Sequence, residues 1–139
     1  MKPPNKVVTG LCAACVVASG YMFGVRSDGN LHEVNIKLQE VAQCALKHST
    51  VDFTVVDGGR TEAEHRNDVA AGRSWIKHSK HQDGLAIDIA ALSHGKVTYN
   101  PAPYYKIAEA FYYCSNGLGI PIVWGGEWRV QDLMHFELK

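Results

Sequence analysis

Three residues that lie far apart in the sequence carry side chains that bind divalent metals. His81 and Asp88 lie within the stretch SKHQDGLAID, residues 79–88, and His135 lies near the C-terminus. Two imidazoles and one carboxylate form the ligand set of a catalytic zinc that keeps one coordination position open for water. Asp132, three residues before His135, remains available as a base. The sequence therefore predicts a metal site with a proton acceptor beside it.

The residues around Asp88 predict the strand that positions it. Gly84 permits a turn just after His81, and residues 85–89 alternate so that three large apolar side chains share one strand face. Ala86 and Asp88 share the other face. The carboxylate is therefore expected on a face of small residues, beside an otherwise apolar strand.

The last strand constrains the second half of the site. Over residues 133–138, His135 and Glu137 face one way, while Phe136 and its apolar neighbours face the core. Asp132 lies three positions before His135, an odd spacing that would put the two on opposite faces of a regular strand. We therefore expect Asp132 in the preceding loop. Glu137 shares the His135 face and could orient that imidazole.

Length and composition limit the class of protein. The chain has 139 residues, of which 46% are hydrophobic and 20% charged, which is enough for one compact domain with a core. Fourteen basic and fourteen acidic residues cancel. No excess of charge therefore favours binding to nucleic acid or to an anionic membrane surface.

Residues 1–21 are expected to form an N-terminal extension, distinct from a domain over residues 22–139. Two lysines are followed by a short apolar run that ends in small residues, which is typical of a secretory signal or a weak signal anchor. Any membrane association is expected only through this segment. The alternative is a non-native or misassigned start, because Met22 could equally begin the domain.

The four cysteines do not predict a disulfide framework. Cys12 and Cys15 have the spacing of a zinc ribbon or redox motif, but a second cysteine pair is missing. Cys44 and Cys114 lie in expected helices, and we interpret them as small buried apolar residues.

Apolar periodicity and turn residues predict a mixture of helices and strands. In chain order these are a helix over residues 31–48, a strand over 52–57, a helix over 61–71, a hairpin over 85–99, a helix over 104–115, and strands over 119–124 and 133–138.

Two further residues near the expected site remain ambiguous. Arg60 follows the strand over residues 52–57, at a junction where side chains commonly project into a cleft, but a solvated surface charge is slightly favoured. His78 could be a fourth ligand because it lies close to His81. A fourth protein ligand would close the site to water, so we interpret His78 as lying outside the ligand set.

These motifs resemble the zinc peptidases that cleave D-alanyl-D-alanine or L-alanyl-D-glutamate bonds in bacterial peptidoglycan, most closely their bacteriophage endolysin branch. That family's Ser-x-His-x-x-Gly-x-Ala-x-Asp pattern is matched by Ser79, His81, Gly84, Ala86 and Asp88. Its acidic residue three positions before a final histidine is matched by Asp132 and His135. The stretch WGGEW, residues 124–128, also resembles the endolysins, and the similarity extends from about residue 22 to residue 138.

The resemblance implies a fold and a set of residue roles. The fold is α+β, with a small antiparallel central sheet flanked by helices, of the hedgehog and D-Ala-D-Ala-peptidase type. The implied cofactor is Zn²⁺, with Asp132 as the catalytic base and Arg60 as an electrophile near the scissile carbonyl. The implied ligands are His81, Asp88 and His135, and the implied substrate-contacting or supporting residues are Ser79, Glu137 and Trp128.

The function implied by the resemblance is hydrolysis of an amide bond in the peptidoglycan stem peptide, with L-alanyl-D-glutamate as the expected bond. A D-alanyl-D-alanine carboxypeptidase is the alternative enzyme. A zinc-containing binding domain, like the signalling domain of hedgehog proteins, and a purely structural zinc site are the non-enzymatic alternatives. We expect a monomer that is made in the host cytoplasm and reaches the cell wall by release or export to the periplasm.

Overall fold

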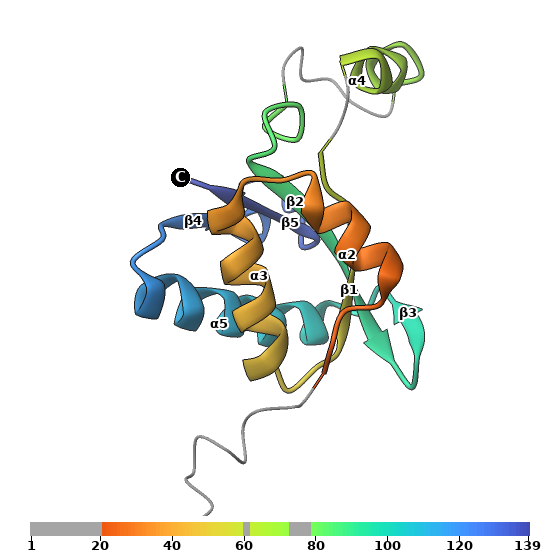
Figure 1. Cartoon of the computed structure of the whole chain (residues 1–139). Helices are drawn as coiled ribbons and strands as arrows, with labels where there is room; N and C mark the ends of the chain where they lie inside the picture. Colours follow the sequence, from red (N-terminus) through yellow and green to blue (C-terminus); the bar gives the residue numbers. More distant parts are fainter. Residues whose placement is uncertain (1–20, 60–61, 73–78) are drawn as a thin grey trace, which may run out of the picture.

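The computed structural model describes residues 21–59, 62–72 and 79–139 (Figure 1). Its first part contains α2 (Val25–His32), α3 (Ile36–His48), β1 (Phe53–Asp57) and α4 (Glu62–Ala70). Its second part contains β2 (Ala86–Ser93), β3 (Lys96–Thr98), α5 (Pro101–Leu118), β4 (Ile122–Trp124), the 3-10 turn η1 (Gly125–Glu127) and β5 (His135–Leu138). The expected α+β class is confirmed.

All strands pair in antiparallel fashion, in the order β1-β2-β5-β4, and β3 pairs with β2. The central strand β2 aligns Asp88 with His135 of β5. Paired residues on neighbouring strands place their side chains on the same face of the sheet. The register therefore brings together two residues that are far apart in the sequence.

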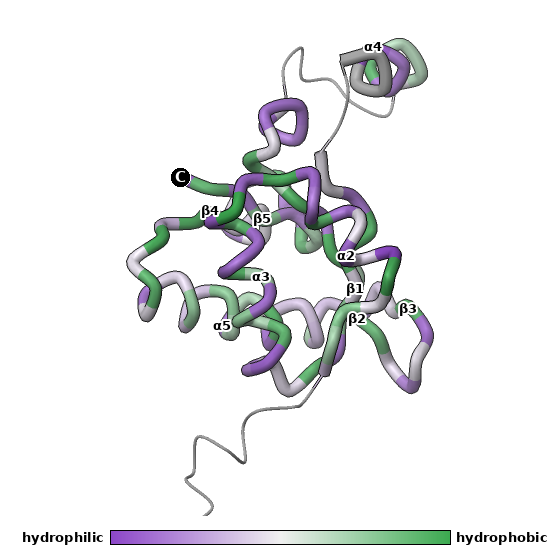
Figure 2. The backbone as a smooth tube through the Cα atoms, viewed as in Figure 1, coloured by the Kyte–Doolittle hydropathy of each residue, from purple (hydrophilic) through white to green (hydrophobic). Residues whose placement is uncertain are grey.

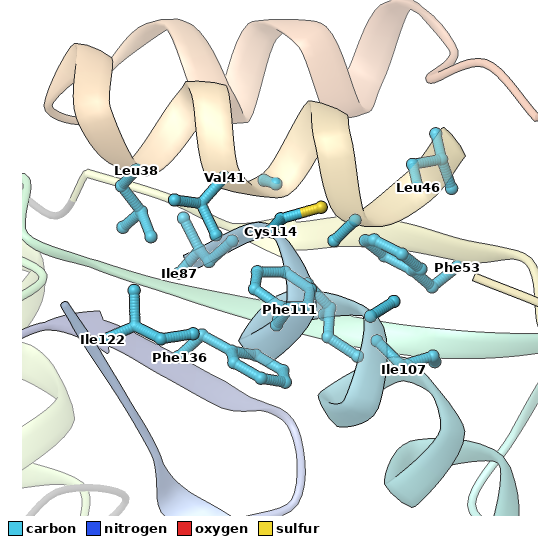
Figure 3. Close-up of a cluster of buried hydrophobic side chains, with 14 of the residues drawn as sticks. Leu38, Val41, Leu46, Phe53, Ile87, Ile107, Phe111, Cys114, Ile122 and Phe136 are labelled. Carbon is cyan, nitrogen blue, oxygen red and sulfur yellow. The ribbon is translucent and has the colours of Figure 1, made fainter. Parts of the chain in front are cut away.

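Helices α3 and α5 lie next to each other and cover the opposite face of the sheet (Figures 1 and 3). Green hydrophobic and purple hydrophilic segments alternate along α3, as expected for a helix with one buried side (Figure 2). The Phe111 ring of α5 stacks on Phe136 of β5 with 3.8 Å between centroids. Ile87 and Ile89 are fully buried in the same core. The alternation expected around Asp88 is therefore confirmed, because its isoleucine neighbours point into the core.

The expected single helix over residues 31–48 is wrong at its N-terminal end, where α2 and α3 are separate helices. Asn35 caps α3 by accepting a hydrogen bond from the Lys37 backbone N–H at 3.0 Å. The Asn35 N–H donates to the carbonyl of Gly84 at 2.7 Å. Gly84 has φ +66°, and a Cβ there would lie 3.2 Å from the carbonyl oxygen of Glu33. The helix break is thus the docking point for the turn that carries His81.

Side chains of α2 cover the outer edge of β1. Ser27 Oγ accepts a hydrogen bond from the Val55 N–H at 3.0 Å, and Asn30 Nδ2 donates to the Val55 carbonyl at 2.9 Å. These side chains occupy the backbone N–H and C=O of Val55 that a further strand would otherwise bind, which hinders edge-to-edge pairing with another chain. Just beyond β1, a Cβ on Gly58 would collide with the carbonyl oxygen of Asn30. Glycine therefore allows this close approach of α2 to the end of β1.

Helix α5 is longer than the range of residues 104–115 that the sequence predicts. It begins at Pro101 because proline fits the first helical position, where its missing N–H has no partner to lose. It continues through Gly117 and ends at the C-cap Gly119, which has φ +66°. The end of the helix is therefore set by the glycine that adopts the left-handed conformation, and the preceding glycine is tolerated inside the last turn.

The interpretation of Cys44 and Cys114 as separate apolar residues is wrong, because they form a disulfide between α3 and α5. Their Cα atoms are 5.9 Å apart although 70 positions separate them in the sequence. The helical pattern shows that both residues face the core but not that they face each other. Cys12 and Cys15 lie outside the described residues.

The remaining elements agree with the sequence to within a few residues. Strand β4 begins at Ile122 and β5 at His135, later than expected, and the loop after β4 contains the short turn η1. Within residues 21–59, 62–72 and 79–139, no helix combines the length and apolar character needed to cross a membrane. The expected boundary between an N-terminal extension and the domain stays a prediction, because residues 1–20 are not described.

Candidate metal centre

The three predicted ligands converge on the face of the sheet that α3 and α5 leave uncovered. His81 comes from the turn before β2, Asp88 from β2 and His135 from β5. His81 Nε2 lies 3.5 Å from Asp88 Oδ2, and His135 Nδ1 lies 3.3 Å from Asp88 Oδ1. Donor atoms of all three side chains lie within 4.8 Å of one another. In tetrahedral coordination with metal–ligand bonds of 2.0 to 2.1 Å, neighbouring nitrogen and oxygen ligand atoms lie about 3.3 Å apart. The spacing therefore fits a single divalent cation.

The second nitrogen of each imidazole has its own acceptor. His81 Nδ1 lies 3.0 Å from the Gly58 carbonyl oxygen, and His135 Nε2 lies 2.8 Å from Glu137 Oε2. A carbonyl and a carboxylate only accept hydrogen bonds, so these two nitrogens carry the protons. His81 Nε2 and His135 Nδ1 are then left with lone pairs directed toward Asp88. Partners of this kind fix the tautomer and orientation of metal-binding histidines.

One oxygen of the Asp88 carboxylate is shielded from solvent in a way that calls for a cation. Within the described part of the chain, its Oδ1 has no hydrogen-bond partner although it is shielded from solvent. A buried, unsatisfied carboxylate oxygen is costly unless a positive charge lies next to it. The imidazoles beside it are buried too, with His81 only 4% and His135 only 7% exposed. The donor set therefore fits a bound metal ion.

Without a metal, protons take the place of the cation. Burial acts to raise the pKa of Asp88, but the two imidazoles outweigh burial and hold this pKa well below its usual range. Burial acts to lower the pKa of His81 and of His135, but Asp88 and the other acceptors outweigh it and raise both values above the ordinary one. The cluster therefore favours positive charge around a negative centre.

Asp132 lies in the loop before β5, as expected, and is exposed. Its backbone N–H donates to the Gly125 carbonyl at 2.9 Å, and its Oδ1 accepts from the Met134 N–H at 3.2 Å. Although the residue as a whole is exposed, neighbouring atoms partly desolvate its carboxyl group, and this desolvation and the nearby charge of Asp88 raise the pKa of Asp132. A Cβ on Gly125 would collide with the Asp132 carbonyl oxygen. Gly125 therefore lets the loop fold back tightly and hold this carboxylate near the ligands.

The other predicted residues occupy different positions around the cluster. Ser79 Oγ accepts from the His81 N–H at 3.3 Å and so holds the turn that carries this ligand. Glu137 contacts His135, which is the position expected for an orienting group. The Trp128 ring lies 4.9 Å from the His135 ring and is 36% exposed, so it forms part of the surface next to the cluster. Arg60 lies outside the described residues, as does His78.

Two contributors were missed from the sequence. Lys80 Nζ lies 3.1 Å from Glu137 Oε1 and donates to the Leu138 carbonyl at 2.7 Å. Gly58 supplies its backbone carbonyl to His81. A backbone acceptor leaves no mark on residue type, and the contact of Lys80 spans 58 positions. Only the position of Lys80 between Ser79 and His81 could have suggested that it lies near the site.

A family model described as phage L-alanyl-D-glutamate peptidase matches residues 19–139. The chain belongs to this family. The L-alanyl-D-glutamate peptidase of Escherichia phage T5 is 37% identical over 123 residues, which cover 86% of this chain and 90% of that protein. The crystal structure of the L-Ala D-Glu endopeptidase ChiX from Serratia marcescens matches with a TM-score of 0.80 and 37% identity. That match covers 85% of this chain and 90% of that one.

Membership in the phage L-alanyl-D-glutamate peptidase family confirms the resemblance found in the sequence. It also confirms the expectation of an enzyme, a peptidase, over that of a binding domain. The family match spans the segments that carry His81, Asp88 and His135, so the cluster lies within the part of the chain that the family shares.

Proposed function

We propose that the chain is a zinc-dependent endopeptidase that hydrolyses the bond between L-alanine and D-glutamate in peptidoglycan stem peptides. The observation that carries the proposal is the convergence of His81, Asp88 and His135 around an unsatisfied carboxylate oxygen. The family match and the 37% identity to a peptidase of this specificity support the choice of bond.

The proposed ligands are His81 Nε2, the Asp88 carboxylate and His135 Nδ1. Three protein ligands with one open position are typical of catalytic zinc sites, whereas structural sites are closed by four. When bound, zinc lowers the pKa of a coordinated water to about 7 and polarises a carbonyl oxygen. Gly58 and Glu137 keep the two imidazoles in the tautomers that offer a lone pair to the site.

Asp132 is proposed as the general base and acid. Its carboxylate accepts a proton from the water as the C–O bond forms, and it then delivers that proton to the nitrogen of the leaving D-glutamate, so that the C–N bond breaks in the second step. The bonds from Met134 and to Gly125 hold the side chain beside the cluster. Arg60 is proposed, from the resemblance alone, to stabilise the developing oxyanion.

The surroundings of the cluster suggest where the peptide binds. Trp128 is exposed next to His135 and is proposed to line the substrate groove. Trp124, by contrast, is 5% exposed and donates its indole N–H to the Leu133 carbonyl at 2.9 Å, so it belongs to the core. We propose that the enzyme acts as a monomer on the cell wall after release or export from the cytoplasm.

Mass spectrometry of digested, purified muropeptides tests this function. We expect cleavage products that end in L-alanine and begin with D-glutamate. Release of the terminal D-alanine alone would instead identify a D-alanyl-D-alanine carboxypeptidase. An intact substrate in the presence of zinc-loaded, folded protein would contradict both enzymatic assignments.

The same assay tests the role of Asp132. Asp132→Ala is expected to lower turnover by roughly 10² to 10⁴-fold, since general acid–base catalysis contributes about that much. Zinc uptake and folding should be retained, because the ligands are unchanged. Glu40→Ala, which removes an exposed carboxylate from α3, is the matched control and should cleave at the parent rate. An Asp132→Ala enzyme as fast as this control would show that Asp132 is not the base.

A further inference from the structure

A second group of side chains that could bind a metal lies on the other side of the sheet, where α3 meets α5. Cys44 and His48 occupy one face of α3, four residues apart, and Cys114 of α5 forms the disulfide with Cys44. His48 Nδ1 lies 3.7 Å from Cys44 Sγ and 3.9 Å from Cys114 Sγ. The group is separated from the His81 cluster by the core, in which Cys114 is buried (Figure 3).

We propose that this group is a redox-dependent metal site. In its oxidised state it is the disulfide, and in its reduced state Cys44, Cys114 and His48 bind a thiophilic divalent cation such as Zn²⁺. Two thiolates and one imidazole form a ligand set that zinc prefers.

The distances around His48 support this proposal. Zinc bonds of about 2.3 Å to sulfur and 2.0 to 2.1 Å to nitrogen place tetrahedral sulfur and nitrogen ligands about 3.6 Å apart. His48 Nδ1 is already 3.7 and 3.9 Å from the two sulfur atoms. The two sulfurs, no longer bonded, would need to separate to about 3.8 Å. Metal binding therefore requires the two sulfurs to separate, whereas Nδ1 of the imidazole already lies at about the right distance from both of them.

His48 is held beside the sulfurs by two contacts. Its Nδ1 lies 3.0 Å from the Cys44 carbonyl oxygen, and its ring packs at 5.1 Å against the ring of Tyr113. In the tautomer that carries its proton on Nε2, Nδ1 presents a lone pair to the sulfurs in place of this hydrogen bond. In that tautomer a rotation of the ring that turns Nδ1 away from the Cys44 carbonyl lets the imidazole serve as a ligand.

The site is accessible from solvent. Cys114 is only 1% exposed, but Cys44 and His48 are half-buried at the rim of an open pocket of about 560 Å³. Tyr113 and Leu118 also line this pocket. A reductant can therefore reach the Cys44 sulfur, and a water molecule can complete the coordination of a bound cation.

The chemistry balances with an external dithiol as reductant. Thiolate attack on the Cys44 sulfur breaks the bond to Cys114, and a second attack releases the reductant as a cyclic disulfide. The protein gains two thiols and the dithiol loses two electrons. Zinc binding then releases the two thiol protons to solvent. Both states join α3 to α5, so the link between the helices would persist in reducing and in oxidising surroundings.

Cobalt binding tests the proposal directly, because a cobalt–thiolate bond gives a charge-transfer absorption that nitrogen and oxygen ligands do not. For this test, Cys12→Ser and Cys15→Ser are introduced into the 139-residue chain, so that Cys44 and Cys114 are its remaining cysteines. After anaerobic reduction and removal of the reductant, Co²⁺ is added. We expect the sulfur band in the reduced protein and no such band in the oxidised protein.

The variant His48→Ala distinguishes a three-ligand metal site from two thiols that bind cobalt weakly without the imidazole. We expect at least a tenfold weaker affinity in the reduced His48→Ala protein, since loss of even an outer partner of a ligand typically costs about 10 to 100-fold. His94→Ala, which removes an exposed histidine in the β2–β3 turn, is the control and should bind as the parent does. A reduced parent without the sulfur band would overturn the proposal, as would a His48→Ala protein of unchanged affinity.

Discussion

At the scale of single residues, the candidate centre is defined by which atom each ligand presents. The Gly58 carbonyl and the Glu137 carboxylate each accept a hydrogen bond from one imidazole, which leaves the opposite nitrogen for the proposed metal. Lys80 in turn pairs with Glu137 at 3.1 Å. The contacts from Lys80 to Glu137 and from Glu137 to His135 therefore position one proposed ligand from outside the metal's own coordination shell.

Removing the acceptor behind His135 should weaken metal binding. Glu137→Ala is expected to lower zinc affinity by about 10 to 100-fold, the usual effect of losing a partner of a ligating histidine. Competition with a chromophoric chelator measures this affinity. Glu109→Ala is the control, since Glu109 is an exposed residue of α5 paired with Lys106. An affinity equal in both variants would remove Glu137 from the metal centre.

The metal-free protein should have a stability that falls as the pH rises above neutrality. The pKa values of His81 and His135 are raised in the folded state above the ordinary 6.5. Their contribution to folding is therefore complete below about 6.5 and is lost as the pH rises through the raised values. The pKa of Asp88 is lowered from 3.8, so its contribution is present above that value and is lost on further acidification.

Thermal unfolding of the oxidised protein in excess chelator measures this dependence. We expect this cluster to contribute most between about pH 4 and pH 6.5. The difference in Tm between the parent and Asp88→Asn isolates the cluster from other titrating groups, and it should shrink as the pH is raised to 8. A difference that grows over this range would contradict the charge arrangement.

At the scale of elements, the site depends on tight junctions more than on the strands themselves. Asp88 and His135 are placed by strand register, whereas His81 and Asp132 are placed by turns in which glycine allows close backbone approach. Gly84 brings the turn before β2 against the break between α2 and α3.

The Gly84 turn offers a stability test with an internal control. Gly84→Ala is expected to destabilise the protein by about 1 to 2 kcal/mol, because alanine is disfavoured at φ +66°. The added methyl group would also lie 3.2 Å from the Glu33 carbonyl oxygen. Gly117→Ala, in α5 with open space around it, should instead stabilise by roughly 0.5 to 1 kcal/mol. Urea unfolding measures both, and a Gly84→Ala protein as stable as the parent would contradict this role of the turn.

The sequence predicts elements best where the signal is local. The strand alternation around Asp88 and the placement of Asp132 in a loop were both inferred correctly from residue spacing. The break between α2 and α3 was missed because the apolar periodicity continues through it, and only the contact between Asn35 and Gly84 shows why the chain turns. The disulfide was missed because helical periodicity does not specify which residues of two packed helices face each other.

At the scale of the whole molecule, one face of the small sheet forms the core and the other face carries the candidate site. Phe136 and Ile87 face the core under α3 and α5, while their neighbours His135 and Asp88 face the candidate site. The sequence motifs were specific enough to predict the family, which the comparisons confirm. The position of Arg60 relative to this face stays a prediction.

Because the core lies on the face of the sheet opposite the candidate metal site, metal removal should leave the fold intact. We expect the chelated, oxidised protein to keep its far-UV circular dichroism spectrum and lose muropeptide hydrolysis, which zinc should then restore. A catalytic metal in a preformed site behaves in this way, whereas a structural metal is needed for folding itself. Unfolding on chelation would identify a structural zinc site.

The most direct test of the central claim is X-ray absorption at the zinc edge of the oxidised, zinc-loaded protein. We predict about one zinc per chain, with nitrogen and oxygen ligands at 2.0 to 2.2 Å and a spectrum that changes in Asp88→Ala. A shell of sulfur at about 2.3 Å, or a zinc environment indifferent to Asp88→Ala, would contradict a metal centre formed by His81, Asp88 and His135.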